Sequence, residues 1–522
     1  MADTLVELIR SNAQSLGDLT AYRFWRDGAV TDVTWSQFDR DCDAFAQLLI
    51  DRGAMPGDRI VLLSENRYEW LVADQAILRA GAFTVALHYP LTKEQAAAQA
   101  KDCGARLAIV SGEHQSAKLP DLDCILIDSR GKPPSDEVIR RSKAIAPNDV
   151  ATIIYTSGTT GESKGAMLTH QNLLSNARAL RELVQAESHE NVVLNFLPLS
   201  HIYARTSDYI SAAVQGVVMA LAASIETVGQ DLQTFRPHAI NAVPRFYEKV
   251  RERIIERRIV RLLGPLGRRL AVKKAFGGRL RYAFSGGAAL DPTVQEFFSQ
   301  AGLTIYQGYG LTETSPVVST CWEEAFKPNT AGRAAPGVEI KIAEDGEILV
   351  RGPNVFVGYW NNEAATREAF DEDGWFRTGD VGELDNDGFL KITDRKKDIF
   401  VLSGGKNVAP MPIENALIND PFILQAVVFG DKQKFTGALI VPDREALSGK
   451  FDLSDNEGIK TFLQQRIDLA LATFSPHERV KRFAIVEEPF SMENGSMTVT
   501  LKLRRSRILH QYADLVEKVY RD

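Results

Sequence analysis

A run of glycine and hydroxyl residues near position 160 has the composition of a phosphate-binding loop. It reads Tyr155-Thr-Ser-Gly-Thr-Thr-Gly-Glu-Ser-Lys-Gly165 and follows an apolar run, residues 150–154, that predicts a strand. The glycines let the backbone turn tightly and present N–H groups to an anion, and Lys164 supplies a positive charge that suits phosphate oxygens. Because a glycine follows Lys164, the loop is not of the G-x-x-x-x-G-K-[ST] type. The candidate phosphate ligands are Thr156, Ser157, Gly158, Thr159, Thr160, Gly161 and Lys164.

Residues 307–314, Gln-Gly-Tyr-Gly-Leu-Thr-Glu-Thr, combine an aromatic ring, a hydroxyl and a carboxylate. The Tyr309 ring offers a flat face for a purine, the Thr312 hydroxyl can donate to a phosphate, and the Glu313 carboxylate is the hard oxygen ligand that Mg²⁺ requires. Upstream, residues 285–289 form a Ser-Gly-Gly-Ala-Ala loop, whose glycines permit close approach of the backbone to a ligand. The candidates from these two segments are Gly286, Gly287, Ala288, Gln307, Gly308, Tyr309, Gly310, Thr312 and Glu313.

Two segments with charged residues follow. Asp380 ends a Gly-Trp-Phe-Arg-Thr-Gly-Asp segment, and its carboxylate can accept both hydrogen bonds of a cis-diol. Asp394 and Arg395 open an Asp-Arg-Lys-Lys-Asp cluster. Taken alone, such a cluster would be a solvated turn.

In their order along the chain, these segments resemble the core motifs of the adenylate-forming superfamily, which includes acyl-CoA synthetases, luciferases and peptide-synthetase adenylation domains. Its usual phosphate loop has proline before the lysine, where this chain has Ser163. The resemblance implies that this loop holds the pyrophosphate end of ATP. The other roles that it implies are adenine stacking for Tyr309, α-phosphate contact for Thr312, the metal ligand for Glu313, ribose binding for Asp380 and Arg395, and the hinge between two domains for Asp394.

Further candidates come from the same resemblance. Leu197-Pro-Leu-Ser-His201 is similar to the segment that lines the entrance for the carboxylic acid, which makes His201 a candidate catalytic residue. Residues 493–505 are similar to the ending of the long-chain fatty acyl-CoA synthetase branch, where Thr-x-Lys precedes Arg-Arg, and Lys502 is its lysine. Adenylation needs such a cation because negative charge accumulates around the α-phosphate. The segment that corresponds to the CoA channel contains Ser403, Gly404, Gly405 and Lys406.

The resemblance implies an ATP-dependent ligase that forms acyl-CoA in two steps through an acyl-adenylate, releasing pyrophosphate and AMP. ATP, Mg²⁺ and coenzyme A, the last as co-substrate, are the implied cofactors. The Thr-x-Lys ending and segments 64–70 and 244–250 resemble the long-chain branch. Medium-chain or aryl acids stay open, because the stretch after residue 250 is shorter than in many long-chain relatives. Transfer of the acyl group to a carrier protein stays open too, as does an inactive nucleotide-binding relative. The presence of the charged residues of all these motifs, Lys164, Glu313, Asp380, Arg395 and Lys502, argues against an inactive relative.

Elements that must position these residues alternate between strands and helices. Residues 58–65 and 106–112 predict buried strands and residues 69–81 a helix, and residues 192–197, 239–243 and 280–284 continue the pattern. Short strands between Gly and Asp turns over residues 346–391 predict an antiparallel, barrel-like piece. We therefore expect an α/β fold: an N-terminal domain, residues 1–394, with two helix-covered sheets and a distorted β-barrel, and a small mobile α+β domain, residues 395–522.

Composition sets outer limits on function. The 522 residues carry a net charge of −7, which argues against a nucleic-acid partner, and the expected partners are the small-molecule substrates. Four scattered cysteines give no metal or disulfide pattern and fit a reducing cytosol, and the first residues lack a signal-peptide pattern. The apolar run 210–225 is short for a membrane span and predicts a buried helix. We expect a cytoplasmic protein.

One segment departs from the average charge. Residues 245–282 contain thirteen Lys or Arg and three Glu, and their apolar positions follow helical spacing. A surface helix with a solvated basic face is the simpler interpretation. The alternative is peripheral contact with anionic lipids at the inner face of a membrane. The sequence does not indicate an oligomeric state.

Overall fold

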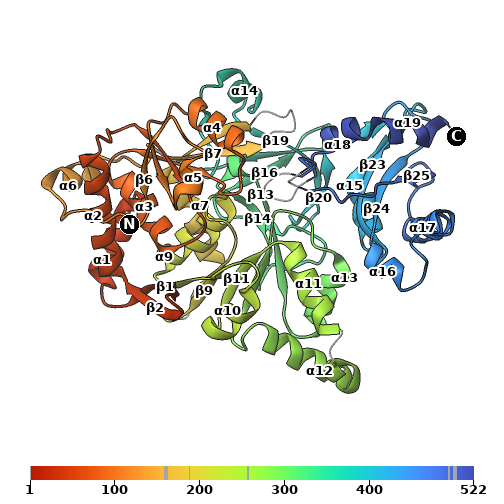
Figure 1. Ribbon diagram of the computed structural model, residues 1–522, viewed down its shortest axis with the longest axis horizontal. Coiled ribbons are helices and arrows are strands. Elements are labelled where there is room, and N and C mark those ends of the chain that lie inside the picture. Colours follow the sequence, from red (N-terminus) through yellow and green to blue (C-terminus); the bar gives the residue numbers. More distant parts are fainter. Residues whose placement is uncertain are drawn as a thin grey trace.

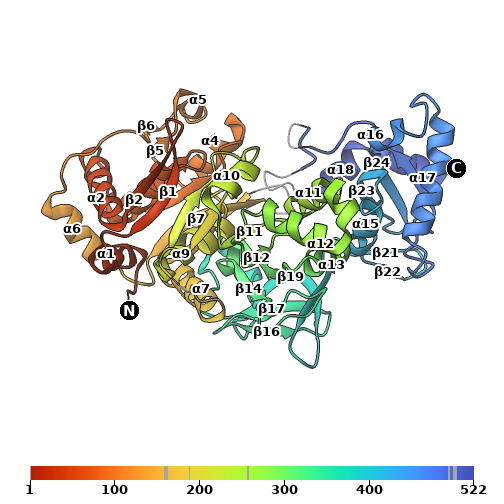
Figure 2. The same cartoon turned by 90° about the horizontal axis from the view of Figure 1, so that it is seen from below.

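The computed structural model describes residues 2–157, 163–186, 188–255, 258–491, 494–497 and 503–521. Within them the chain forms a large body and a smaller C-terminal lobe at one end of the long axis (Figure 1). Helix α1 (Leu5–Ser15) lies towards the other end, as the view from below also shows (Figure 2). The body contains three sheets.

A seven-stranded sheet forms one half of the body. In spatial order its strands are β18 (Gly358–Tyr359), β8 (Ser163–Thr169), β7 (Val150–Ser157), β4 (Phe83–Leu87), β3 (Arg59–Leu63), β5 (Leu107–Val110) and β6 (Asp123–Leu126). The strands from β7 to β6 pair in parallel, and β3, β4 and β5 are almost wholly buried, which explains their continuous apolar runs. The predicted strands at 58–65 and 106–112 are confirmed as β3 and β5, and the predicted helix at 69–81 is confirmed as α3 (Tyr68–Arg79).

A nine-stranded sheet forms the other half. In spatial order its strands are β15 (Arg333–Ala334), β14 (Val317–Thr320), β13 (Ile305–Gly310), β12 (Tyr282–Ser285), β11 (Ala239–Ala242), β9 (Val192–Asn195), β10 (Val218–Leu221), β1 (Thr20–Arg26) and β2 (Ala29–Thr34). The six strands from β13 to β1 are parallel, so their carboxyl ends meet at one edge. Ligands of open α/β sheets bind at this edge.

The prediction of one buried helix over residues 210–225 is wrong in its second half. The helical part comprises α8 (Ile202–Ala204), the π-helical turn η1 (Arg205–Ile210) and α9 (Ser211–Gln215). Gly216 then adopts a left-handed conformation, with φ 66°, and ends the helix. The apolar residues beyond it form β10, which lies between β9 and β1 and is buried throughout. Periodicity does not separate a buried strand from a buried helix in so short a run.

The segment predicted to be antiparallel forms a four-stranded antiparallel sheet. Its strands are β16 (Glu339–Ile342), β17 (Glu347–Arg351), β19 (Phe376–Leu384) and β20 (Leu390–Arg395). Asp380 and Arg395 are direct partners across the β19–β20 pair, although fifteen residues separate them in the sequence. The sheet therefore brings the two charged segments together.

The C-terminal lobe has its own apolar core. Two clusters of buried side chains pack on the two faces of its three-stranded sheet. The strands of the lobe are β21 (Phe400–Val401), β22 (Asn407–Val408), β23 (Ile423–Phe429), β24 (Gly437–Pro442) and β25 (Arg482–Ile485), and its helices are α15 (Pro410–Ile418), α16 (Arg444–Ser448), α17 (Asn456–Ala470), α18 (Arg505–Gln511) and α19 (Ala513–Arg521). This arrangement matches the predicted α+β composition.

The remaining helices belong to the body, and most of them pack on its sheets. They are α2 (Trp35–Asp51), α4 (Lys93–Asp102), α5 (Glu113–Ser116), α6 (Asp136–Lys143), α7 (His170–Leu183), α10 (Val228–Phe235), α11 (Pro244–Ile255), α12 (Arg258–Ala275), α13 (Pro292–Gln300), α14 (Glu363–Glu368) and the 3₁₀ turn η2 (Thr312–Thr314). Among the described residues, none of the helices combines the length and the apolar character that a membrane crossing requires.

Candidate active site

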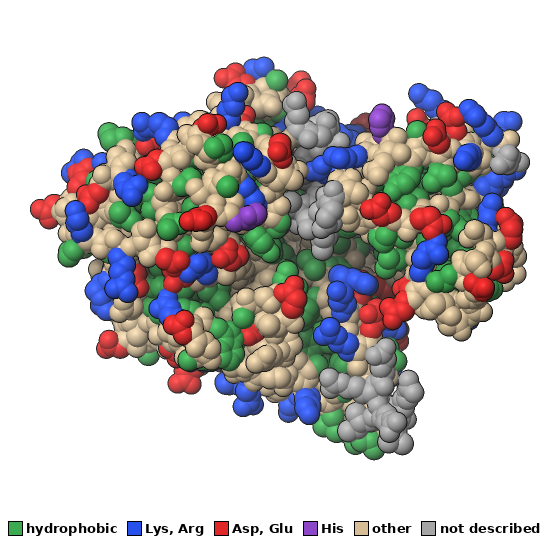
Figure 3. Space-filling view, in the orientation of Figure 1, with side chains coloured by type: hydrophobic (Ala, Val, Ile, Leu, Met, Phe, Trp, Pro, Cys, Tyr) green, Lys and Arg blue, Asp and Glu red, His purple; other side chains and the backbone are tan. Residues whose placement is uncertain are grey.

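A cavity of about 1690 Å³ lies between the body and the C-terminal lobe. The space-filling view shows the molecule hollowed there, with Lys and Arg side chains along part of the rim (Figure 3). The predicted site residues that line it are Thr156, Lys164, His201, Gly286, Gly287, Ala288, Gly308, Tyr309, Gly310, Thr312, Glu313 and Arg395. Segments far apart in the sequence therefore meet on one surface.

The phosphate-loop segment joins two antiparallel strands. Thr156 and Lys164 are partners across the β7–β8 pair, with the loop between them. The Lys164 ammonium lies 5.1 Å from the centre of the Tyr359 ring. Four predicted ligands, Gly158, Thr159, Thr160 and Gly161, fall outside the described residues, and Ser157 is placed only as the end of β7.

Tyr309, Asp380 and Arg395 form a connected group. The Tyr309 hydroxyl donates to Asp380 Oδ2 at 2.7 Å, and Arg395 Nε lies 3.1 Å from Asp380 Oδ1. Burial, together with the Asp380 carboxylate beside it, raises the pKa of Tyr309, so the phenol stays protonated and can donate. The Asp380 carboxylate is buried and does not line the cavity itself, whereas its two partners, Tyr309 and Arg395, do.

Glu313 is a buried carboxylate on the cavity wall. Its Oε1 accepts a hydrogen bond from the Tyr359 hydroxyl at 2.8 Å, and its backbone oxygen accepts from Phe356 N at 2.8 Å. Burial raises the pKa of Glu313, so its charged form is under-solvated, and a bound cation would relieve that cost. No three His, Cys, Asp or Glu side chains of the described ranges cluster as a metal site. A single carboxylate fits Mg²⁺, which keeps waters and phosphate oxygens as its other ligands.

Gln307 lies behind the wall. It is buried, and its Oε1 accepts a hydrogen bond from Leu290 N at 3.1 Å. Its amide therefore ties strand β13 to the glycine loop that follows β12. Gln307 does not line the cavity, in contrast to the contact that the sequence predicts.

His201 faces a second histidine that no sequence pattern indicated. Its Nδ1 accepts a hydrogen bond from Tyr203 N at 3.2 Å, which caps the short helix α8. The ring of His88 stacks on it at 6.2 Å between centroids, and His88 Nδ1 lies 2.7 Å from Ser200 Oγ. Burial lowers the pKa of His88 to about 4, so this imidazole is neutral near pH 7. His88 directly follows strand β4, and only this position at the end of a parallel strand could have marked it in the sequence as a candidate site residue.

Asp394 bridges the body and the lobe. Its Oδ1 accepts from Arg395 N at 2.6 Å and its Oδ2 from Met411 N, in helix α15, at 2.9 Å. Burial raises the pKa of Asp394 to about 6. In the lobe, Arg505 donates to both carboxylate oxygens of Glu414 at 2.7 Å.

Residues on both sides of one predicted functional segment of the lobe line the cavity. Met497, Leu503 and Arg504, which flank Lys502 in sequence, line the cavity, whereas Lys502 itself falls outside the described residues. The predicted CoA-channel residues Ser403, Gly404, Gly405 and Lys406 form the exposed turn between β21 and β22 and do not line it.

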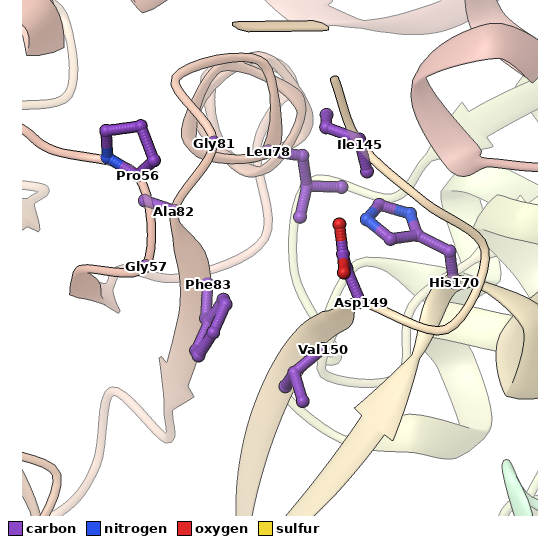
Figure 4. A pocket seen from close by; sticks show the side chains of 10 residues that line it. All are labelled: Pro56, Gly57, Leu78, Gly81, Ala82, Phe83, Ile145, Asp149, Val150 and His170. Carbon is purple, nitrogen blue, oxygen red and sulfur yellow. The ribbon is translucent and has the colours of Figure 1, made fainter. Parts of the chain in front are cut away.

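A second cavity, of about 270 Å³, lies elsewhere in the body. Figure 4 shows its lining, which runs from Pro56 and Gly57 to Asp149, Val150 and His170. The Leu5 N–H donates to His170 Nδ1 at 3.2 Å, and burial lowers the pKa of His170 to about 4. This histidine thus serves to fix the N-terminal helix, and the cavity contains none of the predicted site residues.

Comparison with known proteins gives matches along nearly the whole chain. Residues 9–360 match the family described as AMP-binding enzyme, and residues 397–522 match the AMP-binding enzyme C-terminal domain. The chain is 34% identical to the long-chain-fatty-acid–CoA ligase FadD15 of Mycobacterium bovis, over 99% of this chain and 97% of that protein. It is 30% identical to the peroxisomal long chain acyl-CoA synthetase 6 of Arabidopsis thaliana, over 95% and 83%.

Solved structures share the fold. ATP-bound MatB from Rhodopseudomonas palustris superposes with a TM-score of 0.78 at 24% identity, over 98% of this chain and 99% of that one. The O-succinylbenzoate CoA synthetase MenE of Bacillus subtilis, in complex with ATP and magnesium, gives 0.77 at 24% identity, over 96% and 98%. With both sequence profiles matched and the fold shared over almost its full length, this chain belongs to the AMP-binding enzyme family.

Proposed function

We propose that this protein is a long-chain fatty acid–CoA ligase that uses ATP and passes through an acyl-adenylate. The observation that carries the proposal is the cavity, which joins the Tyr309–Asp380–Arg395 group, the Glu313 carboxylate and a largely apolar wall. The names of the relatives that share 30–34% of their residues with this chain support the long-chain acid.

In the first step, a carboxylate oxygen of the acid forms a bond to the α-phosphorus of ATP, and the bond to pyrophosphate breaks. Tyr309 stacks on adenine, Asp380 and Arg395 hold the ribose, and Thr312 donates to the α-phosphate. The loop from Thr156 to Lys164 holds the pyrophosphate end, and Lys502 offsets the charge near the attacked phosphorus. Glu313 would hold Mg²⁺, which when bound neutralises charge on the phosphate oxygens.

In the second step, the CoA sulfur forms a bond to the acyl carbon and its thiol proton passes to water, while the acyl–phosphate bond breaks and AMP leaves with the electron pair. The segment 403–406 does not line the cavity in this structure, so the step requires the lobe to turn about Asp394. That rotation would withdraw Lys502 and bring Ser403, Gly404, Gly405 and Lys406 to the site. The glycines suit a narrow channel for pantetheine.

The wall for the acyl chain follows the helix from Tyr203 to Gln215. Tyr203, Ser207, Ser211 and Gln215 all line the cavity at intervals of four residues, which places them on one face. At the α-helical rise per residue the helix would be at most about 18 Å long between its two ends, and the π-helical turn η1 shortens it. A wall of this length suits a long acyl chain better than a short one.

The direct test is AMP release by the purified protein with ATP, Mg²⁺, CoA and saturated acids of increasing length. We expect release that requires CoA and is fastest with long acids. Release that requires an acyl carrier protein instead of CoA would favour the alternative acceptor, and activity confined to short or aryl acids would contradict the long-chain assignment. No ATP–pyrophosphate exchange with any acid would indicate an inactive relative.

A Lys502→Ala variant separates the two steps. It should lose adenylation by about 100-fold or more, as expected for removal of a charge that stabilises the transition state. It should still form thioester from supplied acyl-AMP and CoA. Lys397, which also lines the cavity, provides a comparison, because Lys397→Ala should retain most adenylation. Normal adenylation by Lys502→Ala would contradict the assignment.

We also propose that the basic segment 245–282 contacts anionic lipid. Its apolar positions do not share one face: Ile254 in α11 is buried, whereas Leu263, Leu266 and Leu270 in α12 are 48%, 61% and 49% exposed. Gly264 is non-helical and divides α12, so that Leu266 and Leu270 share the second part of α12 with the exposed Arg269, Lys273 and Lys274. The helix lies at the lower rim of the molecule (Figure 1). Such an apolar ridge beside cations is typical of interfacial helices at the surface of a membrane.

Co-sedimentation with phosphatidylglycerol vesicles tests this contact. Leu266→Ser should reduce binding several-fold, because the buried apolar area contributes to interfacial affinity. Leu469→Ser is the control, since Leu469 is a 64% exposed leucine in α17 of the lobe. Equal binding by the two variants would contradict the proposal.

A further inference from the structure

A chain of hydrogen-bonded amides and one buried carboxylate supports the acid-side wall of the cavity. It joins Asn66, between β3 and α3, to Asn195 at the end of β9, to Asp208 in η1 and to Asn241 in β11. Asn195, Asp208 and Asn241 are each at most 7% exposed. The residues that the proposed function places around ATP, namely Tyr309, Asp380, Arg395 and Glu313, form the nucleotide side of the cavity and take no part in these hydrogen bonds.

Asn66 holds the segment that contains His201. Its Nδ2 donates to Leu197 O at 2.6 Å and to Asn195 Oδ1 at 2.9 Å, and its Oδ1 accepts from Leu199 N at 2.9 Å. Both amide hydrogens and the carbonyl oxygen are therefore used. The backbone groups of Leu197 and Leu199 are thereby fixed two to four residues before His201.

Asp208 holds the far side of the same wall. Its Oδ2 accepts from Asn195 Nδ2 at 2.8 Å and its Oδ1 from Asn241 Nδ2 at 2.6 Å. Asn241 also donates to the backbone oxygen of Ser207 at 3.3 Å. Both Asn241 and Ser207 line the cavity. One carboxylate thus connects the strand end before the His201 segment with the first part of the acyl wall.

We propose that Asn66, Asn195 and Asp208 are positioning residues for the carboxylic acid. They fix the positions of His201, Ser207 and Asn241. These three residues in turn determine where the acid's carboxylate and first carbons lie relative to the α-phosphate. This inference rests on the proposed function, because it takes the cavity beside His201 as the acid site. It also gives a role to the segment around Asn66, for which the sequence shows only a resemblance to the long-chain branch.

The network ends only on acid-side residues, so its loss should affect the two substrates unequally. In Asn66→Ala the KM for a long-chain acid should rise about tenfold, which is the effect of one or two net hydrogen bonds. The KM for ATP should stay within about twofold. Asn66→Asp should be no better than Asn66→Ala, because a carboxylate would face the Leu197 and Asn195 oxygens.

A second readout does not depend on activity. Amide hydrogen exchange over residues 197–201 should become faster in Asn66→Ala, since Leu199 N–H loses its acceptor. Asn66→Ala and Asp208→Asn should also combine less than additively on the acid KM, because both act through Asn195. If Asn66→Ala does not fold, Asn66→Ser, which keeps a short acceptor, takes its place.

Arg67→Ala is the matched control. Arg67 is the next residue, but its side chain pairs with Glu69 and Asp128, away from the His201 segment. Unchanged acid KM and unchanged exchange in the Asn66 variants would overturn the proposal, as would equal rises in both KM values. Wild-type protein without AMP release from any fatty acid would instead contradict the proposed function, and the exchange measurement would still test the network.

Discussion

The nucleotide side and the acid side of the one cavity are built in different ways. On the nucleotide side, Tyr309, Arg395 and Glu313 line the cavity with their polar groups, and Tyr309 and Arg395 both bond to Asp380. On the acid side, the polar groups of Asn66, Asn195 and Asp208 bond to each other and to backbone behind the wall. In the proposed function, the first surface would therefore bind ATP through its polar groups, whereas the second would select the acid by the position and shape of a wall.

This difference predicts how variants will separate. A change on the nucleotide side should weaken catalysis with every acid by a similar factor. A change on the acid side should leave the use of ATP intact and alter which acids react. The comparison fails if a nucleotide-side variant changes which acids react, or if an acid-side variant impairs the use of ATP.

The largest effect is expected for Asp380→Ala. The variant removes the acceptor for Tyr309 and Arg395, and in the proposed function also for the ribose. Because hydrogen bonds to a charged group contribute about 1.5–3 kcal/mol each, kcat/KM for ATP should fall about 100-fold or more, equally with short and long acids. Steady-state kinetics with ATP varied at saturating acid would measure this.

Asp385→Ala provides the control for that variant. Asp385 lies just beyond β19 and pairs with Lys327 at 2.6 Å on the exposed surface. Its kinetics should match those of the wild type. A loss in Asp380→Ala that depends on acid length would contradict the separation of the two sides.

The second effect is expected for Ser211→Phe on the acid side. Ser211 is a small residue on the cavity-lining face of the helix from Tyr203 to Gln215. A phenyl ring there should block the far part of the wall, so kcat/KM for sixteen-carbon acids should fall about 30-fold or more, as extra volume in a fitted site requires rearrangement. Acids of six to eight carbons should react nearly as before, and the KM for ATP should not change.

Ser299→Phe, on the exposed face of α13, controls for the added ring. It should leave the acid profile unchanged. If Ser211→Phe lowers kcat/KM equally for all acids, the wall does not follow this helix.

The two sides also differ in what the sequence reveals. Around Tyr309 and Glu313 the residue types and their spacing indicate the chemistry directly, and the structure places these segments on one cavity. The elements β3, β5 and α3 could also be predicted, because their burial gives nearly continuous apolar runs bounded by turn residues.

The acid side could not be predicted in this way. Asn66, Asn195 and Asp208 are separated by up to 142 positions, and only the folded chain shows that they bond to one another. His88 and Tyr359 lie outside any pattern that indicates chemistry, and their roles come from contacts across sheets. Gly216, whose left-handed conformation ends a helix that apolar character alone would extend, determines where the wall stops.

The smallest effect concerns the free energy of unfolding and tests whether the acid-side network contains a buried charge. Burial raises the pKa of Asp208 to about 7, from an ordinary value of about 3.9. The folded state therefore binds this proton more tightly than the unfolded state, so stability is lost as the pH rises towards 7 and is constant above it. Between pH 5.5 and 7.0 the loss is about 2 kcal/mol at most.

In Asp208→Asn this dependence of stability on pH is absent, although a constant offset from the changed hydrogen bonding remains. The melting temperature of the wild type minus that of Asp208→Asn should therefore fall by about 1–2 °C from pH 5.5 to 7.0, because a chain of this size has a large entropy of unfolding, and then level off. A difference that does not vary with pH would show that Asp208 keeps one protonation state throughout, and the network would then lack the titrating buried charge that distinguishes it from the groups facing the nucleotide.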